Sequence, residues 1–366
     1  MAKKLFVKGN EALARAAIRA GCRFYFGYPI TPQNDIPEYL SAELPKVGGT
    51  FMQAESEIAS INMLLGAAAV GARAMTSSSS PGISLKQEGI SYMASCELPG
   101  VIVNVSRTGP GLGGIAASQG DYFQATRGGG HGDYRVIALG PNSAQEMYDL
   151  TILAFHLAEK YRTPVVILAD SVLGQMQESL DVSKEYQMDA LPEKDWVLDG
   201  CKGRAPRLLK SLYLDGEASI EHNWKLYRKY QSWKEKEVRF ERVETEDAEL
   251  LIGAYGSVAR ISKTSIRWAR QKGLKVGLLR PITLFPFPEV EFGRLAGKVR
   301  QILVLEQNTG QMVEDVRLAV NGRVPVEFMG KPTGLVMEPE EILAKIESCF
   351  GDGALEARRP RDEEQS

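Results

Sequence analysis

Short apolar segments alternate with helical segments through the first half of this chain, and this alternation limits the folds that it can adopt. The apolar segments lack the period-two pattern of half-exposed strands, so we expect both faces of each strand to be buried. The sequence predicts strands at 24–26, 101–106, 135–139 and 164–169, and helices at 11–20, 57–71 and 143–161. Strands of this kind, separated by helices, are typical of a mainly parallel sheet covered on both faces.

Capping residues refine two of these helix boundaries. Asn10 is predicted to cap the first helix, and Gly21 stands where a helix commonly ends. Thr31 and Pro32 follow the strand at 24–26 and predict a further helix, with threonine as its cap and proline in its first turn.

A second α/β unit is expected from Glu249 onward. Residues 250–253 form an apolar run that is followed by Gly256, and the next helix is expected to reach Gln271. Further strands are predicted at 275–279, 301–305 and 324–328. We see no short repeat, so the two units are read as separate α/β domains.

The segment between the two units is charged and holds three of the four tryptophans. Ile220, Trp224, Tyr227 and Tyr230 recur at helical spacing, which predicts an amphipathic helix packed against another surface. Residues 225–242 carry seven basic and three acidic side chains, a pattern open to two interpretations. A salt-bridged connecting helix is favoured over a nucleic-acid-binding one.

These observations predict four regions. A first domain is expected over 1–190, a charged connecting segment over 191–246, and a second domain over 247–350. Residues 351–366 are rich in glycine and then in charge, and they are predicted to form a disordered tail.

Composition excludes several classes of protein. The 44 basic and 46 acidic residues nearly cancel, which argues against a nucleic-acid partner. No long apolar run follows the N-terminus, and the longest uncharged stretch, 58–72, is too short for a bilayer, so we expect a soluble, non-exported protein without a membrane partner. The four cysteines lie far apart, which predicts no metal or iron–sulfur site within this chain and fits a reducing cytoplasm.

Three glycine-containing segments resemble cofactor- or nucleotide-binding motifs, but none of them completes its motif. Residues 109–114 satisfy the dinucleotide-binding pattern, but a loop is expected to continue where a helix is required, so a nicotinamide site is not expected. No glycine–lysine pair is followed by the hydroxyl residue of a Walker motif. Gly351–Gly353 mimics the start of the motif that binds magnesium and thiamine diphosphate, but only 13 residues follow it, too few to complete that motif.

Glu57 is the sharpest chemical feature of the sequence. It is the only ionisable side chain between residues 57 and 72, and it stands at the head of an apolar helix. A carboxyl held there loses hydration, which favours its protonated form and prepares it for proton exchange. The alternative, that it is a first-turn acid favourable to the helix dipole, stays open on this observation alone.

Polar residues also follow three of the predicted strands. Arg107 ends the strand at 101–106, Thr31 lies beyond the strand at 24–26, and residues 76–82 are predicted to form a loop rich in hydroxyl groups. Ligands of parallel sheets bind beyond the carboxyl ends of the strands, where arginine can grip a carboxylate by two hydrogen bonds. We expect these loops and Glu57 to share one crevice, although a surface salt bridge, a helix cap and a simple turn are the plainer interpretations.

Taken together, these residues resemble a known family. Tyr28–Pro32, Glu57 nine residues before Gly66, residues 76–82, and Arg107 followed by Ser118–Asp121 are similar to the alpha subunit of 2-oxoacid:ferredoxin oxidoreductases. The likeness is greatest to the branched-chain (3-methyl-2-oxobutanoate) type and covers nearly the whole chain. It extends to 280–288 and 306–311 in the second unit, which is similar to a transketolase-C-like domain.

The resemblance implies a thiamine diphosphate enzyme whose pyrimidine-binding domain is the first domain of this chain. Glu57 would hydrogen-bond to N1′ of the aminopyrimidine and favour the tautomer that removes the thiazolium proton. Arg107 would bind the substrate carboxylate, and Thr31 would lie near the keto group. Cofactor-binding residues would include Tyr28, Pro29, Ser79 and Gly82 in addition to Glu57.

The resemblance also implies partners. Family members carry the magnesium and diphosphate motif on a beta subunit and the 4Fe-4S clusters on partner subunits, with gamma and ferredoxin-like delta subunits completing the complex. We therefore expect this chain to be inactive alone. In the complex, a 2-oxoacid and coenzyme A would give acyl-CoA and CO2, with electrons passing to ferredoxin.

Several alternatives stay open. The substrate could be 2-oxoglutarate or pyruvate rather than a branched-chain 2-oxoacid. A non-oxidative thiamine decarboxylase or synthase is less favoured, because such enzymes carry the diphosphate half on the same chain. A non-catalytic scaffold subunit is the third possibility, and the role of the loop at 306–311 is open, with interface packing as the default.

Overall fold

The computed structural model describes residues 4–332 and 334–351. Its larger sheet has seven strands in the order β12-β6-β7-β5-β4-β2-β3, and only β12 runs antiparallel to its neighbour. The strands are β2 (Phe24–Gly27), β3 (Thr50–Gln53), β4 (Ala74–Ser78), β5 (Gly100–Ser106), β6 (Ile137–Leu139), β7 (Pro164–Asp170) and β12 (Thr283–Phe285). The predicted mainly parallel sheet is confirmed.

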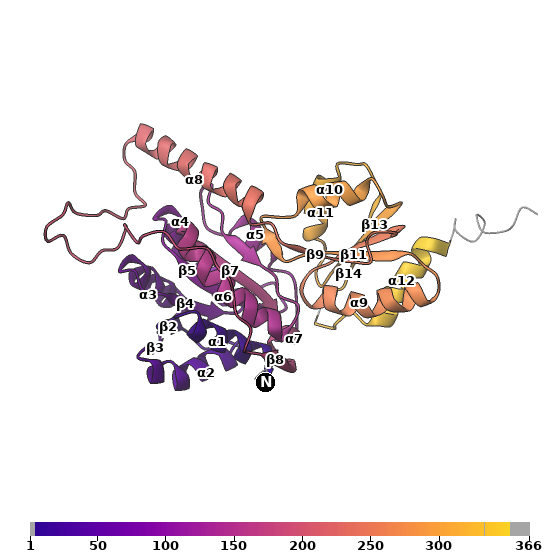
Figure 1. Ribbon diagram of the computed structural model, residues 1–366, viewed down its shortest axis with the longest axis horizontal. Helices are drawn as coiled ribbons and strands as arrows, with labels where there is room; N and C mark the ends of the chain where they lie inside the picture. The colour runs from indigo at the N-terminus through magenta and orange to yellow at the C-terminus, as the bar shows by residue number, and fades with distance from the viewer. Residues whose placement is uncertain (1–3, 333, 352–366) are drawn as a thin grey trace, which may run out of the picture.

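Helices cover both faces of this sheet (Figure 1). On one face, α3 and α4 pack against Ile102 of β5, and on the other, α1, α2 and α6 pack against Val101 and Val103. The helices of this domain are α1 (Gly9–Arg19), α2 (Asp35–Glu43), α3 (Glu57–Ala69), α4 (Ser80–Ser95), α5 (Tyr122–Arg127), α6 (Ala144–Tyr161) and α7 (Ser171–Gln175), with a 3-10 turn η1 (Pro45–Val47).

The smaller sheet has five strands in the order β14-β13-β10-β11-β9, and β9 alone is antiparallel to its neighbour. Its strands are β9 (Phe240–Val243), β10 (Leu250–Gly253), β11 (Val276–Pro281), β13 (Gln301–Glu306) and β14 (Val326–Gly330). Its helices are α9 (Gly256–Gln271), α10 (Glu289–Ala296), α11 (Met312–Val320) and α12 (Pro339–Gly351). The predicted helix end at Gln271 is confirmed.

Two pairings join distant parts of the chain. β1 (Lys4–Lys8) and β8 (Gln177–Asp181) form a separate antiparallel pair. β12 follows β11 of the second sheet, and yet it pairs with β6 of the first. The domain ranges drawn from the sequence placed residues 283–285 with the second unit alone, because a three-residue strand gives no signal of its distant partner.

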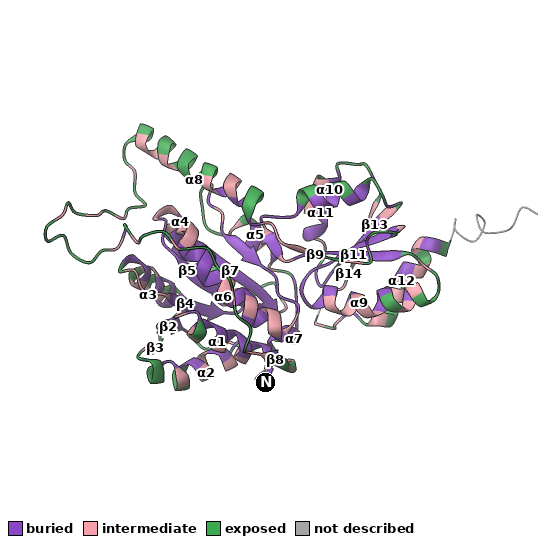
Figure 2. Cartoon of the chain, viewed as in Figure 1, coloured by how far each residue is buried: buried purple, intermediate pink, exposed green. Residues whose placement is uncertain are grey.

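Helix α8 (Gly216–Lys236) connects the two domains and lies at the edge of the molecule (Figures 1 and 2). Its apolar face is packed only in part: Tyr230 is buried, whereas Ile220, Trp224 and Tyr227 are 62%, 56% and 50% exposed. The predicted helix is confirmed, and of the four residues only Tyr230 is buried against this chain. The helix is nevertheless salt-bridged, because Lys225 and Lys229 both pair with Glu97.

Two predicted caps were also wrong. Asn10 lies inside the first turn of α1, and Lys8 occupies the cap position. The Asn10 amide Nδ2 donates to Pro32 O at 2.9 Å and to Asp35 Oδ2 at 3.0 Å, so the side chain makes tertiary contacts instead of a cap. Thr31 and Pro32 precede α2 by several residues, and Asn34 occupies the cap position of that helix.

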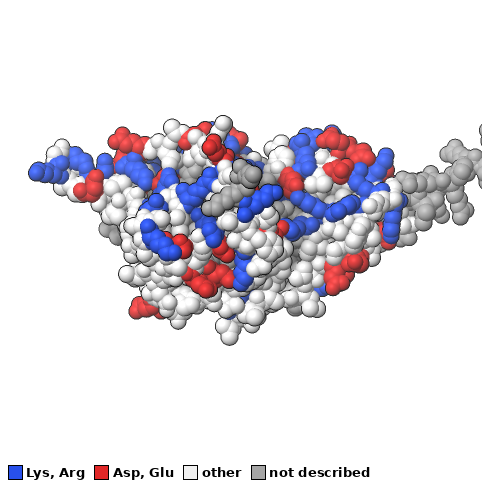
Figure 3. Space-filling model, turned by 60° about the horizontal axis from the view of Figure 1, so that its bottom comes forward, with Lys and Arg blue, Asp and Glu red and all other residues white. Residues whose placement is uncertain are grey.

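The surface carries both signs of charge. Figure 3 shows lysine and arginine interspersed with aspartate and glutamate over one face of both domains. Within residues 4–332 and 334–351, none of the helices combines the length and the apolar character that a membrane span requires. The predicted disordered tail lies, apart from Gly351 at the end of α12, outside the described residues.

Candidate active site

The carboxyl ends of β5, β4 and β2 lie side by side at one edge of the larger sheet. Arg107 follows β5, Ser79 follows β4, and Thr31 lies four residues beyond β2. This edge is the place at which open parallel sheets bind their ligands. It is therefore the candidate active site.

Arg107 and Thr31 are in contact. The guanidinium of Arg107 donates from Nη1 to Thr31 O at 2.9 Å and from Nη2 to Leu112 O at 2.9 Å. The Arg107 side chain is buried, and its Nε has no hydrogen-bond partner among the described residues. The loop backbone therefore fixes the guanidinium, while Nε and a second N–H on each terminal nitrogen stay available for an anion.

Glu57 begins α3, and Ser56 caps that helix by accepting a hydrogen bond from Ala59 N at 3.1 Å. Only 6% of Glu57 is exposed. Within the described part of the chain, its carboxylate has neither a hydrogen-bond partner nor an ion-pair partner. A largely buried carboxylate without a partner in the protein is available to bind a ligand, so Glu57 is a candidate ligand-binding group.

Gly82 lies directly against Glu57. A Cβ added at Gly82 would stand 2.5 Å from Glu57 Oε1 and 2.1 Å from Ser78 Oγ. Only glycine leaves room for the carboxylate in this position. The predicted association of Gly82 with Glu57 thus has a steric basis, although its contact with a cofactor stays a prediction.

The predicted loop at 76–82 is not a loop. β4 continues through Ser78, Ser79 occupies the N-cap position of α4 without a side-chain capping hydrogen bond, and Gly82 lies in the first turn of that helix. The Thr76 and Ser77 hydroxyl groups of the strand are buried and hydrogen-bonded inside the domain, as when Tyr25 Oη pairs with Ser77 Oγ at 2.7 Å. A run of hydroxyl residues was read as a turn because the sequence does not show these buried partners.

Unpartnered polar atoms gather at the ends of these two strands. Two of them, Ser78 Oγ and Ser79 Oγ, lie at the end of β4. The other two, Asn104 Oδ1 and Ser106 Oγ, lie near the end of β5. None of the four has a partner among the described residues. Together with Glu57 and Arg107 Nε, they give this edge several free donors and acceptors. Such a set can bind a polar heterocycle and a carboxylate.

Ser80 links the Glu57 side of this edge to the Arg107 side. Its hydroxyl accepts from Arg107 N at 2.9 Å and donates to Asp121 Oδ2 at 2.6 Å. Asn104 Nδ2 also donates to Asp121 Oδ2, at 2.8 Å. Asp121 belongs to the 118–121 run that contributed to the family resemblance, but sequence reasoning gave it no role.

Tyr28 and Pro29 lie at the same edge and are exposed in this chain. The Tyr28 carbonyl accepts a long hydrogen bond from Gln33 Nε2, at 3.4 Å. Neither residue has a recorded contact with Glu57 within the described ranges. Their predicted binding of the cofactor therefore stays a prediction.

A cavity of about 580 Å³ opens beside Thr31. Its lining consists of Thr31, Pro32, Asn34, Asp35, Ile115, Ser171, Val172 and Gln175. Asp35 is the one charged side chain in this lining. Its pKa is lowered: burial alone would raise it, but hydrogen bonds from Lys8, Asn10 and Gln175 outweigh burial. The cavity therefore combines apolar walls with one fixed carboxylate.

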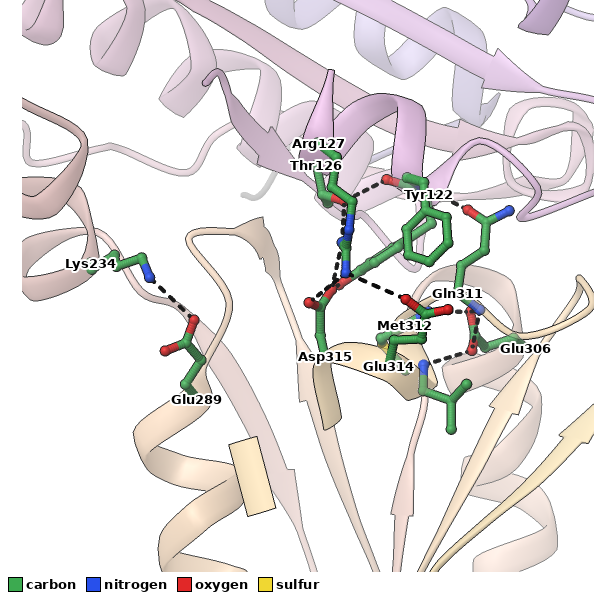
Figure 4. Close-up of polar contacts among 12 residues, drawn as sticks. Tyr122, Thr126, Arg127, Lys234, Glu289, Glu306, Gln311, Met312, Glu314 and Asp315 are labelled. Carbon is green, nitrogen blue, oxygen red and sulfur yellow. Dashed lines mark hydrogen bonds and ion pairs between the residues drawn. The ribbon is translucent and has the colours of Figure 1, made fainter. Parts of the chain in front are cut away.

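The loop at 306–311 joins the two domains (Figure 4). Glu306 is fully buried, and its carboxylate accepts from the backbone N–H groups of Gln311, Met312 and Val313. Asn308 Nδ2 donates to Gln119 O at 2.9 Å, and Gln307 N donates to Gln119 Oε1 at 2.9 Å. The default interpretation of this loop, interface packing, is confirmed for these contacts.

Helix α5 adds a second part of the joint. Figure 4 shows Tyr122 and Arg127 pointing toward α11, where both contact Asp315. Tyr122 Oη donates to Asp315 Oδ2 at 2.6 Å, and Arg127 Nη2 lies 3.0 Å from Asp315 Oδ1. The run at 118–121 therefore connects the candidate active site to the second domain.

Two family models match the chain and together cover most of it. One, described as pyruvate flavodoxin/ferredoxin oxidoreductase, thiamine diphosphate-binding, matches residues 15–239. The other, described as pyruvate:ferredoxin oxidoreductase core domain II, matches residues 248–342.

Curated proteins and solved structures agree with these models. The ketoisovalerate oxidoreductase subunit VorB of Methanothermobacter marburgensis is 50% identical over 94% of this chain and 98% of its own length. The 2-oxoglutarate synthase subunit KorA of Methanocaldococcus jannaschii is 41% identical over 92% of this chain and 97% of its own. A 2-oxoglutarate:ferredoxin oxidoreductase from Magnetococcus marinus, solved with 2-oxoglutarate, coenzyme A and succinyl-CoA bound, superposes with a TM-score of 0.86 at 27% identity. The superposition covers 94% of this chain and 65% of that one.

Proposed function

Since this chain belongs to the 2-oxoacid:ferredoxin oxidoreductases, we propose that it is the subunit that supplies the pyrimidine half of a thiamine diphosphate site. The complex would oxidise a 2-oxoacid with coenzyme A to acyl-CoA and CO2 and pass the electrons to ferredoxin. One observation carries the proposal: the buried Glu57 carboxylate has no partner within the described residues, and Gly82 leaves the space beside it open.

The residues present fit an aminopyrimidine ring. Such a ring offers ring nitrogens and an amino group, and the site offers a carboxylate at Glu57 with unpartnered hydroxyls at Ser78 and Ser79. Bound thiamine diphosphate supplies a carbon nucleophile and an electron sink. Glu57 would hold a proton at a ring nitrogen, and the burial of its carboxylate would keep water from competing for that proton.

Arg107 and Thr31 would bind the substrate. The loop backbone orients the Arg107 guanidinium, and Nε with the remaining N–H groups can receive a carboxylate. The Thr31 hydroxyl accepts a long hydrogen bond from Asn34 at 3.4 Å and can still donate to a keto oxygen.

The cavity beside Thr31 supports an aliphatic substrate. Pro32, Ile115 and Val172 give it apolar walls, and Asp35 would repel a second carboxylate such as that of 2-oxoglutarate. We therefore favour a branched-chain 2-oxoacid over 2-oxoglutarate. The 50% identity to a ketoisovalerate subunit, against 41% to a 2-oxoglutarate subunit, supports the same choice.

The named relatives are subunits, which implies that this chain also works within a complex. We propose that a beta subunit supplies the diphosphate and Mg²⁺ half of the site, and that the 4Fe-4S clusters lie on partner subunits, with gamma and delta-type subunits completing the assembly. The four unpaired cysteines support a reducing compartment, the cytoplasm.

Reconstitution tests this function. The purified chain and the complex with its partner subunits would each receive 3-methyl-2-oxobutanoate, pyruvate or 2-oxoglutarate, with coenzyme A and a ferredoxin or viologen acceptor. We expect no turnover by the chain alone and the highest kcat/KM with 3-methyl-2-oxobutanoate in the complex. Full activity of the isolated chain would contradict the shared site, and a preference for 2-oxoglutarate would contradict the substrate assignment.

A further inference from the structure

Lys86 lies inside the first domain, where α4 packs against α3 and β4. Its side chain is fully buried. The ammonium donates to Thr76 Oγ1 of β4 at 2.9 Å and to Ser60 Oγ of α3. Both partners are neutral hydroxyl groups, so a cation is held in the domain interior by uncharged acceptors alone.

This arrangement is costly for a structural residue. A desolvated ammonium normally contacts a carboxylate, because neutral partners replace only part of its lost hydration. Among the residues that the structure describes, no carboxylate oxygen lies within 4 Å of Lys86 Nζ. Lys229, a partly buried lysine, does have such a partner, since its Nζ lies 3.0 Å from Glu97 Oε1.

Glu57 is the charged group that affects the pKa of Lys86. Burial lowers the pKa of Lys86 to about 7, and the negative charge of Glu57 acts in the opposite direction. Ser60 joins the two residues, because it accepts from Lys86 and donates to Glu57 O at 2.9 Å. The cation thus lies under the first turn of the helix that carries the candidate catalytic acid.

Other charged groups on the neighbouring elements are engaged elsewhere. On α4 itself, Glu88 accepts from the Tyr92 hydroxyl in an exposed contact. Near the start of α4, Asp121 accepts from Ser80 and Asn104. Thr76 is the contact from β4 and Ser60 is the contact from α3, whereas Glu57 acts on Lys86 through its charge alone.

We propose that Lys86 is a positioning residue for Glu57: through Ser60 its amino group fixes the first turn of α3, and it places a positive charge beneath the Glu57 side chain. This role rests on the proposed function of Glu57 in proton exchange. A positive charge close to a carboxyl group stabilises the carboxylate form.

A double-mutant cycle tests the coupling without any cofactor. Urea unfolding of the full-length chain would be followed at pH 7 for the wild type, Lys86→Met, Glu57→Gln and the double variant. We expect the two substitutions not to be additive. Glu57→Gln should be more destabilising, as judged by the urea midpoint, in the wild-type background than in the Lys86→Met background. The control pair, Lys229→Met with Glu57→Gln, is expected to be additive.

Additivity of the Lys86 pair would overturn the proposal. Because this cycle needs neither partner subunits nor thiamine diphosphate, its outcome is separate from that of the function proposed above. A complex that fails to turn over 2-oxoacids would refute the function and leave the measured coupling intact.

A pH profile tests the direction of the effect. In the reconstituted complex, Lys86→Met is expected to move the acid limb of kcat to higher pH by about half a unit, which is about a threefold loss on the limb, with the plateau retained. A lowered plateau with an unmoved limb would indicate a purely structural role and would overturn the proposal.

Should Lys86→Met fail to fold, Ser60→Ala tests the same link. That variant removes one of the two acceptors of the ammonium and so weakens its charged form. The acid limb is expected to move in the same direction by a smaller amount, and an unmoved limb would overturn the proposal.

Discussion

Two buried glutamates lie close to the starts of helices in this molecule: Glu57 is the first residue of α3, and Glu306, the last residue of β13, directs its carboxylate to the start of α11. They differ in what surrounds them. Glu306 precedes α11 and accepts hydrogen bonds from three backbone N–H groups of that helix and from Asn308 Nδ2 (Figure 4). Glu57 opens α3 at a similar depth, and its carboxylate has no such partner among the described residues. Both residues are glutamates, but the carboxylate oxygens of Glu306 accept hydrogen bonds from the described residues and those of Glu57 do not.

This contrast distinguishes a glutamate that is buried to stabilise the fold from one that is buried to bind a ligand. Hydrogen bonds to Glu306 offset the cost of its desolvation in part, although burial still raises its pKa above the ordinary value. Glu57 has no such hydrogen bond or ion pair among the described residues, and the charge of Lys86 acts on it only at a distance. A protein tolerates an unsatisfied buried group chiefly where a ligand completes it, so the contrast assigns Glu306 to the domain joint and Glu57 to the chemistry.

The largest effect is expected from Glu57→Gln in the reconstituted complex. The amide keeps the shape of the side chain and cannot exchange a proton, so kcat should fall by roughly 10²–10⁴-fold. Turnover with 3-methyl-2-oxobutanoate and coenzyme A measures this loss. Glu55→Gln, at an exposed neighbouring acid, is the matched control and should keep wild-type activity. Unchanged activity of Glu57→Gln would favour the scaffold alternative.

Glu306→Ala should instead act on stability. This substitution leaves the backbone N–H groups at the start of α11 without acceptors in the buried contact between the domains. We expect it to lower the free energy of unfolding by about 3 kcal/mol. Urea denaturation measures the change. The matched control is Glu314→Ala, whose exposed side chain lies 4.0 Å from Arg127 and should contribute less than about 0.5 kcal/mol. Equal effects of the two variants would remove the distinction between structural and functional burial.

The sheet could be predicted because its central strands are continuous apolar runs. Residues 101–106 and 164–169 need no partner to be recognised, and both are strands. Strands β1, β8, β9 and β12 were missed because they are short or partly polar and depend on distant pairing. Their positions follow from tertiary contacts that no local pattern records.

The same distinction explains what could be predicted of the candidate site. Glu57 stood out because the residues around it in the sequence are apolar, and the structure buries it. Lys86 and Asp121 were missed, since each lies among ordinary polar neighbours in the sequence and only packing gives it a role. Ser78 was taken for part of a loop, because the partners of β4 are invisible to local reasoning.

Gly82→Ala tests whether the open space around Glu57 matters. The added methyl would overlap the Glu57 carboxylate and the Ser78 hydroxyl, so it should displace Glu57 and lower kcat by about tenfold. Gly66→Ala is the matched control on α3, because a methyl there meets nothing within 4 Å and should stabilise the helix by up to about 1 kcal/mol. Wild-type turnover by Gly82→Ala would show that the carboxylate does not need this space.

The smallest effect concerns how stability depends on pH near Glu57. Burial lowers the pKa of Lys86 to about 7, whereas an unfolded lysine titrates near 10.4. Between these values the unfolded chain binds the extra proton, so Lys86 makes stability rise with pH across that window and contributes no such rise below it.

Between pH 7.5 and 8.5 this rise should be about 1 kcal/mol in the wild type relative to Lys86→Met, as urea unfolding at the two pH values would measure. Parallel curves for the two proteins would mean that Lys86 reaches solvent or a counter-ion in solution. In that case Lys86, like the charged groups at the contact between the domains, would have a partner. Glu57 would then be the residue that still distinguishes the first domain from that contact.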